Sequence, residues 1–192
     1  MPACRFTRSG KAVGSAPTKC ARAAVKPRNF AIFPTTTLVE VENRHHRAGG
    51  VVVQQAEVLR ICAVARELGL ATFLDRARLW NASAASGLTV SELAAPFDLV
   101  AVAFSKGLGA PGGSLMAGST ALITAAVRHR QRLGGAMRQN GIFTAAALHA
   151  LDFHLTRLHE DHANARAFAQ ALAAGAPRPG HCPDQHRGLP LA

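Results

Sequence analysis

The segment Leu99–Phe104 is a short, unbroken apolar run that is followed at once by Ser105, Lys106 and a series of glycines. A run of this length, rich in valine and alanine, predicts a strand of a parallel sheet that is covered on both faces. Open α/β sheets bind their ligands outside the carboxyl ends of such strands. We therefore expect Lys106 to lie at a ligand site and to be less solvated than a surface lysine.

A lysine in this position has a specific chemical use. When an ammonium group is partly removed from water its pKa falls, and the neutral amine can then attack a carbonyl carbon. Several of the residues around Lys106 are small, among them Ser105, Gly107 and Gly109, which leaves room for a bulky cofactor. A lysine that works in this way needs a carboxylate partner, and Asp75 is the candidate.

The glycines of Gly107–Gly112 also match the spacing Gly-x-Gly-x-x-Gly of a dinucleotide-binding loop. That motif opens a helix, and an acidic residue follows it about 20 positions later. Here Pro111 and a predicted strand follow, and no Asp or Glu occurs between Asp98 and Asp152. The context therefore favours a reactive lysine over a dinucleotide site.

The chain before this strand predicts a βαβ unit. Thr35–Glu42 has the pattern of a strand, Gln54–Leu68 carries its apolar residues on one helical face, and Ala71–Asp75 is the next strand. A connection of this kind predicts a parallel sheet. Asp75 and Lys106 then follow neighbouring strands at the same edge of the sheet, where their opposite charges can converge on one crevice.

The rest of the chain is predicted to be mainly helical, with a short hairpin strand at Ser114–Ala117. The expected helices are Trp80–Ser86, Ser91–Ala95 with Ser91 as its cap, Thr120–Leu133, Arg138–Phe153 and Leu155–Ala173. Residues 1–20 form a basic leader without acids, compatible with a mitochondrial transit peptide or a non-native start. Residues 176–192 are rich in Pro, Gly and His. We expect both ends to be disordered, which leaves residues 21–175 as the folded domain.

The chain of 192 residues has 22 Lys and Arg against 11 Asp and Glu, a formal net charge of +11. This excess predicts affinity for anions, such as a phosphate-bearing cofactor, nucleic acid or an acidic surface. Nucleic-acid binding is less favoured, because aromatic residues make up 5% of the chain and single-strand binders stack bases on them. Four widely spaced cysteines indicate reduced thiols, as in the cytoplasm. No segment predicts a membrane span or a secretory signal.

Four motifs together resemble the threonine aldolase family of β-eliminating lyases. The motifs are Glu42-Asn43 with His45, the segment Asp75–Asn81, the segment Phe104–Ser114, and the segment Leu133–Gln139. The resemblance covers about residues 21–175 and implies part of the large domain of a fold type I, aspartate-aminotransferase-like enzyme. This is an α/β fold with a mostly parallel sheet and flanking helices. In the family, much of the phosphate cradle and a small C-terminal domain lie outside the matching part.

The resemblance implies that the site binds pyridoxal 5'-phosphate. Lys106 matches the lysine that holds this cofactor covalently, and Asp75 matches the carboxylate that keeps its pyridine nitrogen protonated. Arg78 matches the arginine that binds the substrate carboxylate, for which a guanidinium fork is suited. His45 matches an active-site histidine, although two adjacent histidines in a basic loop would otherwise indicate a solvated segment.

Further positions bear on the cofactor phosphate. Arg138 matches an arginine that, in the family, reaches the phosphate bound by a neighbouring subunit. The matching lysine is Gln131 here, with Arg132 beside it as a substitute. Arg76 stands where the family usually has glycine, so a long cation is expected to crowd the carboxylate partner of the cofactor.

The implied function is that of a low-specificity threonine aldolase, which cleaves L-threonine or a related β-hydroxy amino acid to glycine and an aldehyde. The family also implies a homo-oligomer, a dimer or a tetramer, with neither nucleic acid nor membrane as a partner. An alternative is a truncated, catalytically inactive fragment, which the departures at Arg76 and Gln131 favour. A second alternative is a basic module that binds nucleic acid or other anions.

Several histidines near the C-terminal end of the predicted domain invite comparison with a metal site. Four of them have two acids close by, and the set comprises His149, His154, His159, His162, Glu160 and Asp161. Helical spacing is compatible with shared ligation, but no open catalytic geometry is implied. A solvated helix face is the preferred interpretation, and no metal is expected.

Overall fold

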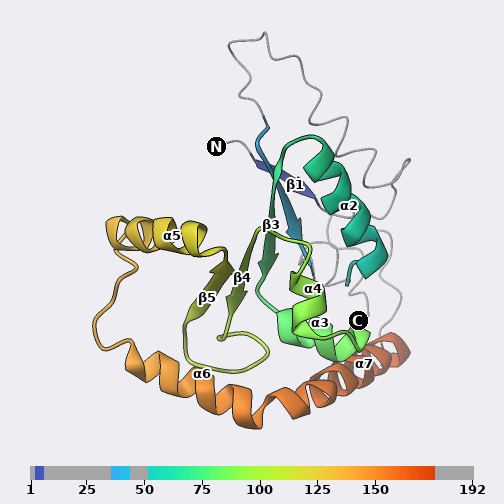
Figure 1. Ribbon diagram of the computed structural model, residues 1–192. Coiled ribbons are helices and arrows are strands. Elements are labelled where there is room, and N and C mark those ends of the chain that lie inside the picture. Colours follow the sequence, from blue (N-terminus) through green and yellow to red (C-terminus); the bar gives the residue numbers. More distant parts are fainter. Residues whose placement is uncertain (1–2, 7–35, 44–51, 176–192) are drawn as a thin grey trace.

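The computed structural model describes residues 3–6, 36–43 and 52–175, which form a sheet with flanking helices (Figure 1). The strands are β1 (Ala3–Phe6), β2 (Leu38–Glu42), β3 (Ala71–Arg76), β4 (Leu99–Ala103) and β5 (Ser114–Gly118). The helices are α2 (Gln55–Glu67), α3 (Leu79–Ser86), α4 (Val90–Ala94), α5 (Thr120–Arg132), α6 (Gly141–Phe153), the 3-10 turn η2 (Leu155–Arg157) and α7 (Leu158–Gly175).

The sheet has the order β1-β2-β3-β4-β5. Its first four strands are parallel, and β5 returns antiparallel to β4 as a hairpin. The expected α/β fold with a mostly parallel sheet is therefore confirmed.

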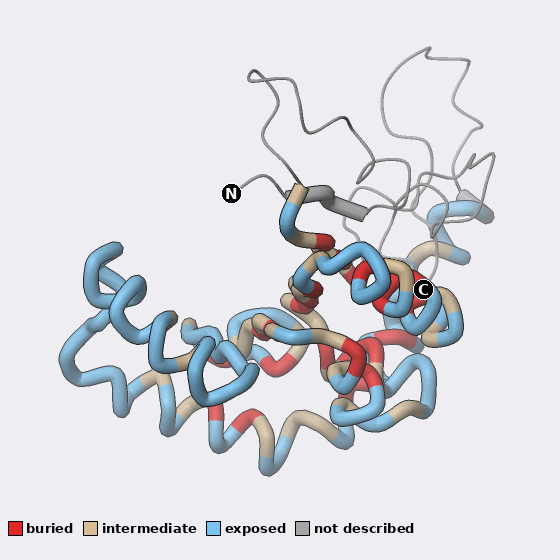
Figure 2. The backbone as a smooth tube through the Cα atoms, turned by 45° about the horizontal axis from the view of Figure 1, so that its top comes forward, coloured by how far each residue is buried: buried red, intermediate tan, exposed pale blue. Residues whose placement is uncertain are grey.

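The main hydrophobic core lies on one face of this sheet, under α2, α3 and α4. In Figure 2 the buried parts of the chain concentrate there. The order β2, β3, β4 adds each strand in the same direction, and right-handed crossovers then place all the connecting helices on the same face. The buried core residues are Val39, Val41, Ile61, Ala65, Leu74, Leu79, Leu93, Val100 and Val102.

The opposite face of the sheet, called here the open face, is not covered by these helices. On β4, Val100 and Val102 are 7% and 6% exposed, whereas Leu99, Ala101 and Ala103 are half-buried. The prediction that this strand is buried on both faces is therefore wrong for one face in the described structure. An unbroken apolar run does not reveal that both crossover helices fall on the same side.

The register of β3 and β4 is held by a reciprocal pair at their beginnings. The Oδ2 atom of Asp98 accepts hydrogen bonds from the backbone N–H of Thr72, at 2.7 Å, and from its Oγ1, at 2.8 Å. The backbone N–H of Asp98 in turn donates to Thr72 Oγ1 at 3.0 Å. This register sets Asp75 beside Ala101 at the far end of the two strands.

Some element ends differ from the sequence predictions. Thr89, not Ser91, caps α4, because its hydroxyl accepts from the backbone of Glu92 while the Glu92 carboxylate accepts from Thr89. Helix α6 begins at Gly141 and not at Arg138, since Gln139 has a φ of 54° and interrupts the helix. Helix α7 begins at Leu158, after the 3-10 turn η2.

The segment Ala3–Phe6 forms strand β1, parallel to β2, although residues 1–20 were expected to be disordered. Pairing at a sheet edge uses backbone groups, which any sequence without proline supplies. The remaining residues of the leader and residues 176–192 lie outside the described chain.

The C-terminal helices form an arc at one side of the sheet (Figure 1). Helix α5 contains no buried residue, and most of α6 and α7 is exposed along its length (Figure 2). Large apolar side chains on this arc are exposed, among them Ile142, Phe153 and Phe168 at 71%, 61% and 63%. No helix in the described part of the chain has the length and apolarity needed to cross a membrane.

Candidate functional site

The lysine turn, defined here as residues 104–110, follows β4 and carries Lys106. Its backbone is closed by hydrogen bonds from the Gly109 N–H to the Lys106 carbonyl, at 2.9 Å, and from the Ala110 N–H to the Phe104 carbonyl, at 3.1 Å. Gly109 has a φ of 72°, which favours glycine. The turn therefore has a defined backbone that presents Lys106 just beyond the end of β4.

Lys106 is exposed. This corrects the expectation of a partly desolvated lysine. The turn projects past the last residue of β4, and α2, α3 and α4 pack on the other face of the sheet. The amine is thus accessible to a ligand at the carboxyl edge of the strands.

Asp75 lies on the open face of β3, where it is half-buried. It pairs in register with Ala101 of β4, and Ala103 lies two residues closer to the lysine turn on the same face. Methyl side chains therefore line β4 between the carboxylate and the turn. Ala101 and Ala103, called here the floor of the site, lie along β4 between the level of Asp75 and the lysine turn.

Arg76 lies on the core face, with Thr72 and Leu74, and is 1% exposed. Its Nε and Nη1 atoms have no hydrogen-bond partner among the described residues. Burial lowers the pKa of its guanidinium to about 10. Arg76 therefore does not crowd the open face as expected, because adjacent residues of a strand point to opposite faces.

Arg78, the residue predicted to bind the substrate carboxylate, is half-buried at the N-terminal boundary of α3. It lies three residues after Asp75 in the turn from β3 to α3. His45 lies outside the described residues. The structure therefore brings Asp75 and Arg78 to the same strand-to-helix connection, and the roles of Arg78 and His45 stay predictions.

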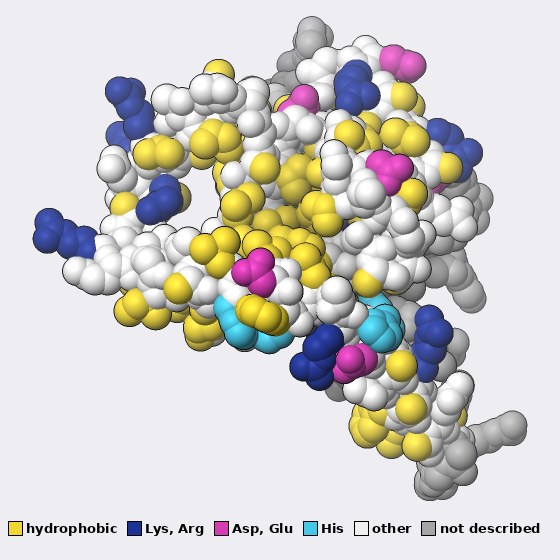
Figure 3. Space-filling view, turned by 60° about the horizontal axis from the view of Figure 1, so that its bottom comes forward, with side chains coloured by type: hydrophobic (Ala, Val, Ile, Leu, Met, Phe, Trp, Pro, Cys, Tyr) yellow, Lys and Arg dark blue, Asp and Glu magenta, His cyan; other side chains and the backbone are white. Residues whose placement is uncertain are grey.

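The two arginines predicted to bind phosphate lie away from the lysine turn. Arg132 ends α5, Arg138 lies in the connection to α6, and both are exposed, as is Gln131. Figure 3 shows Lys and Arg side chains projecting on the side where Figure 1 places α5 and this connection. Their exposure is compatible with the expected contact to another subunit, which also stays a prediction.

Two histidines from the C-terminal part of the described chain contact the lysine turn and the neighbouring helix α3. The Nδ1 atom of His154 lies 2.7 Å from the carbonyl oxygen of Leu108 in the lysine turn. The Nε2 atom of His162 lies 3.1 Å from the carbonyl oxygen of Asn81 in α3, and His162 is 9% exposed. The interpretation of these histidines as a solvated helix face is therefore wrong for His154 and His162.

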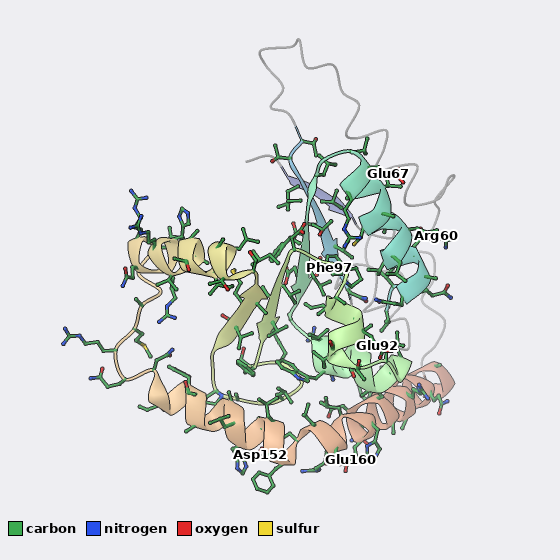
Figure 4. All side chains as sticks on the ribbon, viewed as in Figure 1. Arg60, Glu67, Glu92, Phe97, Asp152 and Glu160 are labelled. Carbon is green, nitrogen blue, oxygen red and sulfur yellow. The ribbon has the colours of Figure 1, made fainter. Side chains whose placement is uncertain are left out.

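The other histidines and acids that were compared with a metal site, and the nearby Asp152, do not converge. His149, His159 and Asp161 are exposed, and Figure 4 shows Asp152 and Glu160 on the outer side of the α6–α7 arc. Glu160 instead forms a surface ion pair with Arg157, at 3.0 Å. Within residues 3–6, 36–43 and 52–175, no group of three or more His, Cys, Asp and Glu side chains is arranged to hold a metal ion.

A signal for the two inward histidines was present in the helical spacing. His162 follows the buried Leu158 by four residues, so both lie on the same face of α7. His154 follows the buried Ala147 and Ala150 by seven and four residues. Their places on buried faces indicated contacts with the fold, but spacing alone could not identify their carbonyl partners.

Comparison with known proteins extends this description. Residues 7–178 match the family model described as beta-eliminating lyase. The chain is 39% identical over 160 residues to low-specificity L-threonine aldolase 1 of Arabidopsis thaliana. The matched region covers 83% of this chain and 45% of that protein. It is 38% identical over 159 residues to the low specificity L-threonine aldolase of Escherichia coli K12, covering 83% and 46%. The chain thus spans less than half the length of these relatives.

Solved structures agree on the fold. A putative L-allo-threonine aldolase from Listeria monocytogenes has a TM-score of 0.68 at 25% identity, covering 74% of this chain and 40% of that one. An aspartate aminotransferase from Thermus thermophilus, solved with maleate, has a TM-score of 0.57 at 15% identity and covers 82% and 41%. The second likeness extends the shared fold to the aminotransferases.

Proposed function

Because the chain belongs to the β-eliminating lyase family, whose members use pyridoxal phosphate, we propose that it carries the core of a threonine aldolase site. The reaction is the retro-aldol cleavage of a β-hydroxy amino acid to glycine and an aldehyde. The observation that supports this proposal is the arrangement of an exposed amine, Lys106, and a carboxylate, Asp75, around a floor of alanines at the carboxyl edge of β3 and β4.

The residues present fit pyridoxal phosphate in part. Ala101 and Ala103 are small side chains on the open face beside Asp75, and the carboxylate of Asp75 would hold the ring nitrogen of the cofactor. Lys106 offers a primary amine for the aldehyde carbon. A cluster of cations close to the lysine turn is not found among the described residues, and Arg132 and Arg138 are proposed to serve the phosphate of a second subunit.

Each residue of the site has a defined task in this proposal. Asp75 would accept a hydrogen bond from the protonated ring nitrogen of the cofactor and so keep it positively charged. Arg78 binds the substrate carboxylate, and His45 accepts the proton of the β-hydroxyl group, directly or through water. When bound, pyridoxal phosphate supplies the electron sink for the pair released as the Cα–Cβ bond breaks.

The competing candidate is a catalytically inactive fragment, which an activity measurement separates from the aldolase. A further observation concerns surfaces that the described structure leaves exposed. Helix α5 has no buried residue, β5 is exposed along its whole length, and large apolar residues are exposed on α6 and α7. Surfaces of this kind are covered in a stable protein by another chain or segment. We propose that a second copy covers them, in line with the homo-oligomer that the resemblance implies.

The decisive experiment is reductive trapping of pyridoxal phosphate on the purified chain. Four lysines occur in the sequence, and three of them, Lys11, Lys19 and Lys26, precede residue 27. After borohydride treatment, peptide mass mapping should place the pyridoxyl group on Lys106. Lys106→Ala should remove this adduct, whereas Lys26→Arg should not.

Glycine release from threonine then separates the two candidates. Trapping on Lys106 together with cleavage supports the aldolase. Trapping without cleavage supports the inactive fragment. Labelling confined to the other lysines, or equal in wild type and Lys106→Ala, would refute the assignment of Lys106.

A further inference from the structure

The lysine turn is closed by its own backbone bonds, but these do not fix it to the rest of the molecule. Two of its residues, Leu108 and Ala110, are buried. Leu108 is 1% exposed and packs with Ala150 and Leu158 in a second hydrophobic cluster. The carbonyl of Leu108 also lies 2.7 Å from His154 Nδ1, across 46 residues of sequence. Since a carbonyl oxygen only accepts, Nδ1 carries the proton and donates. His154 thus adds a directional contact at Leu108 to a turn that is also held by the hydrogen bond from the Phe104 N–H to the Gly113 carbonyl, at 3.0 Å.

A second contact acts on Gly107, the residue directly after Lys106. A Cβ at Gly107 would overlap the side-chain amide of Asn81, so the backbone of the turn lies directly against that amide. The backbone carbonyl of Asn81 accepts a hydrogen bond from His162 Nε2 at 3.1 Å. His162 is buried, and it therefore holds the part of α3 on which Gly107 rests.

We propose that His154 and His162 are positioning residues for Lys106. His154 holds the turn through Leu108, and His162 holds it through Asn81 and Gly107. Together they connect α6 and α7 to the residues that flank the reactive amine on its C-terminal side. This inference rests on the proposed function of Lys106, since positioning matters to chemistry only if that amine reacts.

The positioning role predicts local effects. Loss of one neutral hydrogen bond of about 1 kcal/mol makes local opening roughly fivefold more frequent. The backbone N–H of Gly109 reports this opening, because it is bonded to the Lys106 carbonyl. The backbone N–H groups of α2, which packs in the other hydrophobic cluster, report global opening instead.

The test uses His154→Phe, which keeps a ring but removes the donor, and His154→Gln, which keeps a donor on a flexible side chain. The matched control is His149→Phe. His149 is an exposed neighbour whose ring centroid lies 5.5 Å from that of His154. In the described structure its side chain makes no hydrogen bond to the lysine turn. Hydrogen exchange is measured on the chain without cofactor, and the rate of pyridoxyl labelling at Lys106 is measured separately.

In His154→Phe, Gly109 should exchange roughly fivefold faster, with no change in α2, and labelling of Lys106 should slow by a similar factor. His154→Gln should recover part of both effects, and His149→Phe should resemble wild type. For the contact between His162 and Asn81, His162→Gln should slow the labelling of Lys106 less than His162→Phe does.

Three results would overturn the proposal. The first is unchanged hydrogen exchange at Gly109 in His154→Phe. The second is exchange in α2 that accelerates as much as exchange at Gly109. The third is an effect of His149→Phe on exchange and labelling as large as that of His154→Phe. If wild type takes up no pyridoxal phosphate at Lys106, the proposed function fails. The exchange experiment would still decide whether His154 holds the turn.

Discussion

Asp75 and Arg76 are consecutive residues of β3 whose side chains lie on opposite faces of the sheet. Asp75 is half-buried on the open face, and Arg76 is 1% exposed on the core face. The strand alternates its side chains, so a cation at position 76 leaves the floor of the site open. Arg76 thus affects the stability of the hydrophobic core more directly than the shape of the site.

Replacing Arg76 by methionine should stabilise the protein. The guanidinium is buried with two unpartnered nitrogen atoms among the described residues, and methionine fills a similar length without polar atoms. We expect the free energy of unfolding to rise by roughly 1–3 kcal/mol, the usual cost of buried unsatisfied donors. Urea denaturation followed by circular dichroism measures it.

The matched control is Arg60→Met, which removes an exposed arginine paired with Glu57 on α2 (Figure 4). Its effect should stay within about 0.5 kcal/mol. A clear loss of stability in Arg76→Met would show that the guanidinium has an acceptor that the described residues do not supply.

Replacing Asp75 by asparagine should impair cofactor-dependent chemistry without unfolding the chain. The amide is nearly isosteric but cannot balance the charge of a protonated ring nitrogen. A charge-assisted hydrogen bond contributes roughly 1.5–3 kcal/mol, so threonine cleavage should fall about 10- to 100-fold. Labelling of Lys106 under borohydride should persist, and its complete loss would instead assign Asp75 a role in holding the lysine.

Substitution of Gly107 by alanine should displace the lysine turn. The new Cβ would overlap the amide of Asn81, and relieving such overlap costs roughly 1–3 kcal/mol. Labelling of Lys106 should slow by roughly 5- to 150-fold. The double variant Gly107→Ala/Asn81→Ala should regain most of the rate, because the amide is gone. Gly141→Ala, where a Cβ meets nothing within 4 Å, is the control and should not change the rate.

The capping box of α4 should give stability a pH dependence. Hydrogen bonds from the Thr89 side chain and backbone hold the pKa of Glu92 below its ordinary value of 4.5. A lowered carboxyl pKa stabilises the folded state above pH 4.5, and this contribution disappears as pH falls through the lowered value. The melting temperature of Glu92→Gln should therefore lie below that of wild type at pH 7, and the gap should narrow toward pH 3. A gap of constant size would contradict this origin.

Local signals were sufficient for much of the fold. The period of two in β2 and the apolar face of α2 depend on neighbouring residues, and both elements are found with small shifts at their ends. The motifs around Asp75 and Lys106 were likewise contiguous, which is why the family membership could be predicted from them. The roles of Asp75 and Lys106 stay predictions. Thr89 was missed as a cap since Ser91, two residues later, is also a capping type.

Other features depend on how distant segments meet. Periodicity in β4 could not show that one of its faces stays open, because that follows from the handedness of two crossovers. Nor could it show that Arg76 enters the core with its Nε and Nη1 atoms unpartnered among the described residues. His154 and His162 reach carbonyl groups 46 and 81 residues away, so only the packing of α6 and α7 against the lysine turn and α3 gives them a role. Residue identity and spacing set the chemistry available to this chain, and tertiary packing set which groups meet, because contacts between distant segments leave no local periodic pattern.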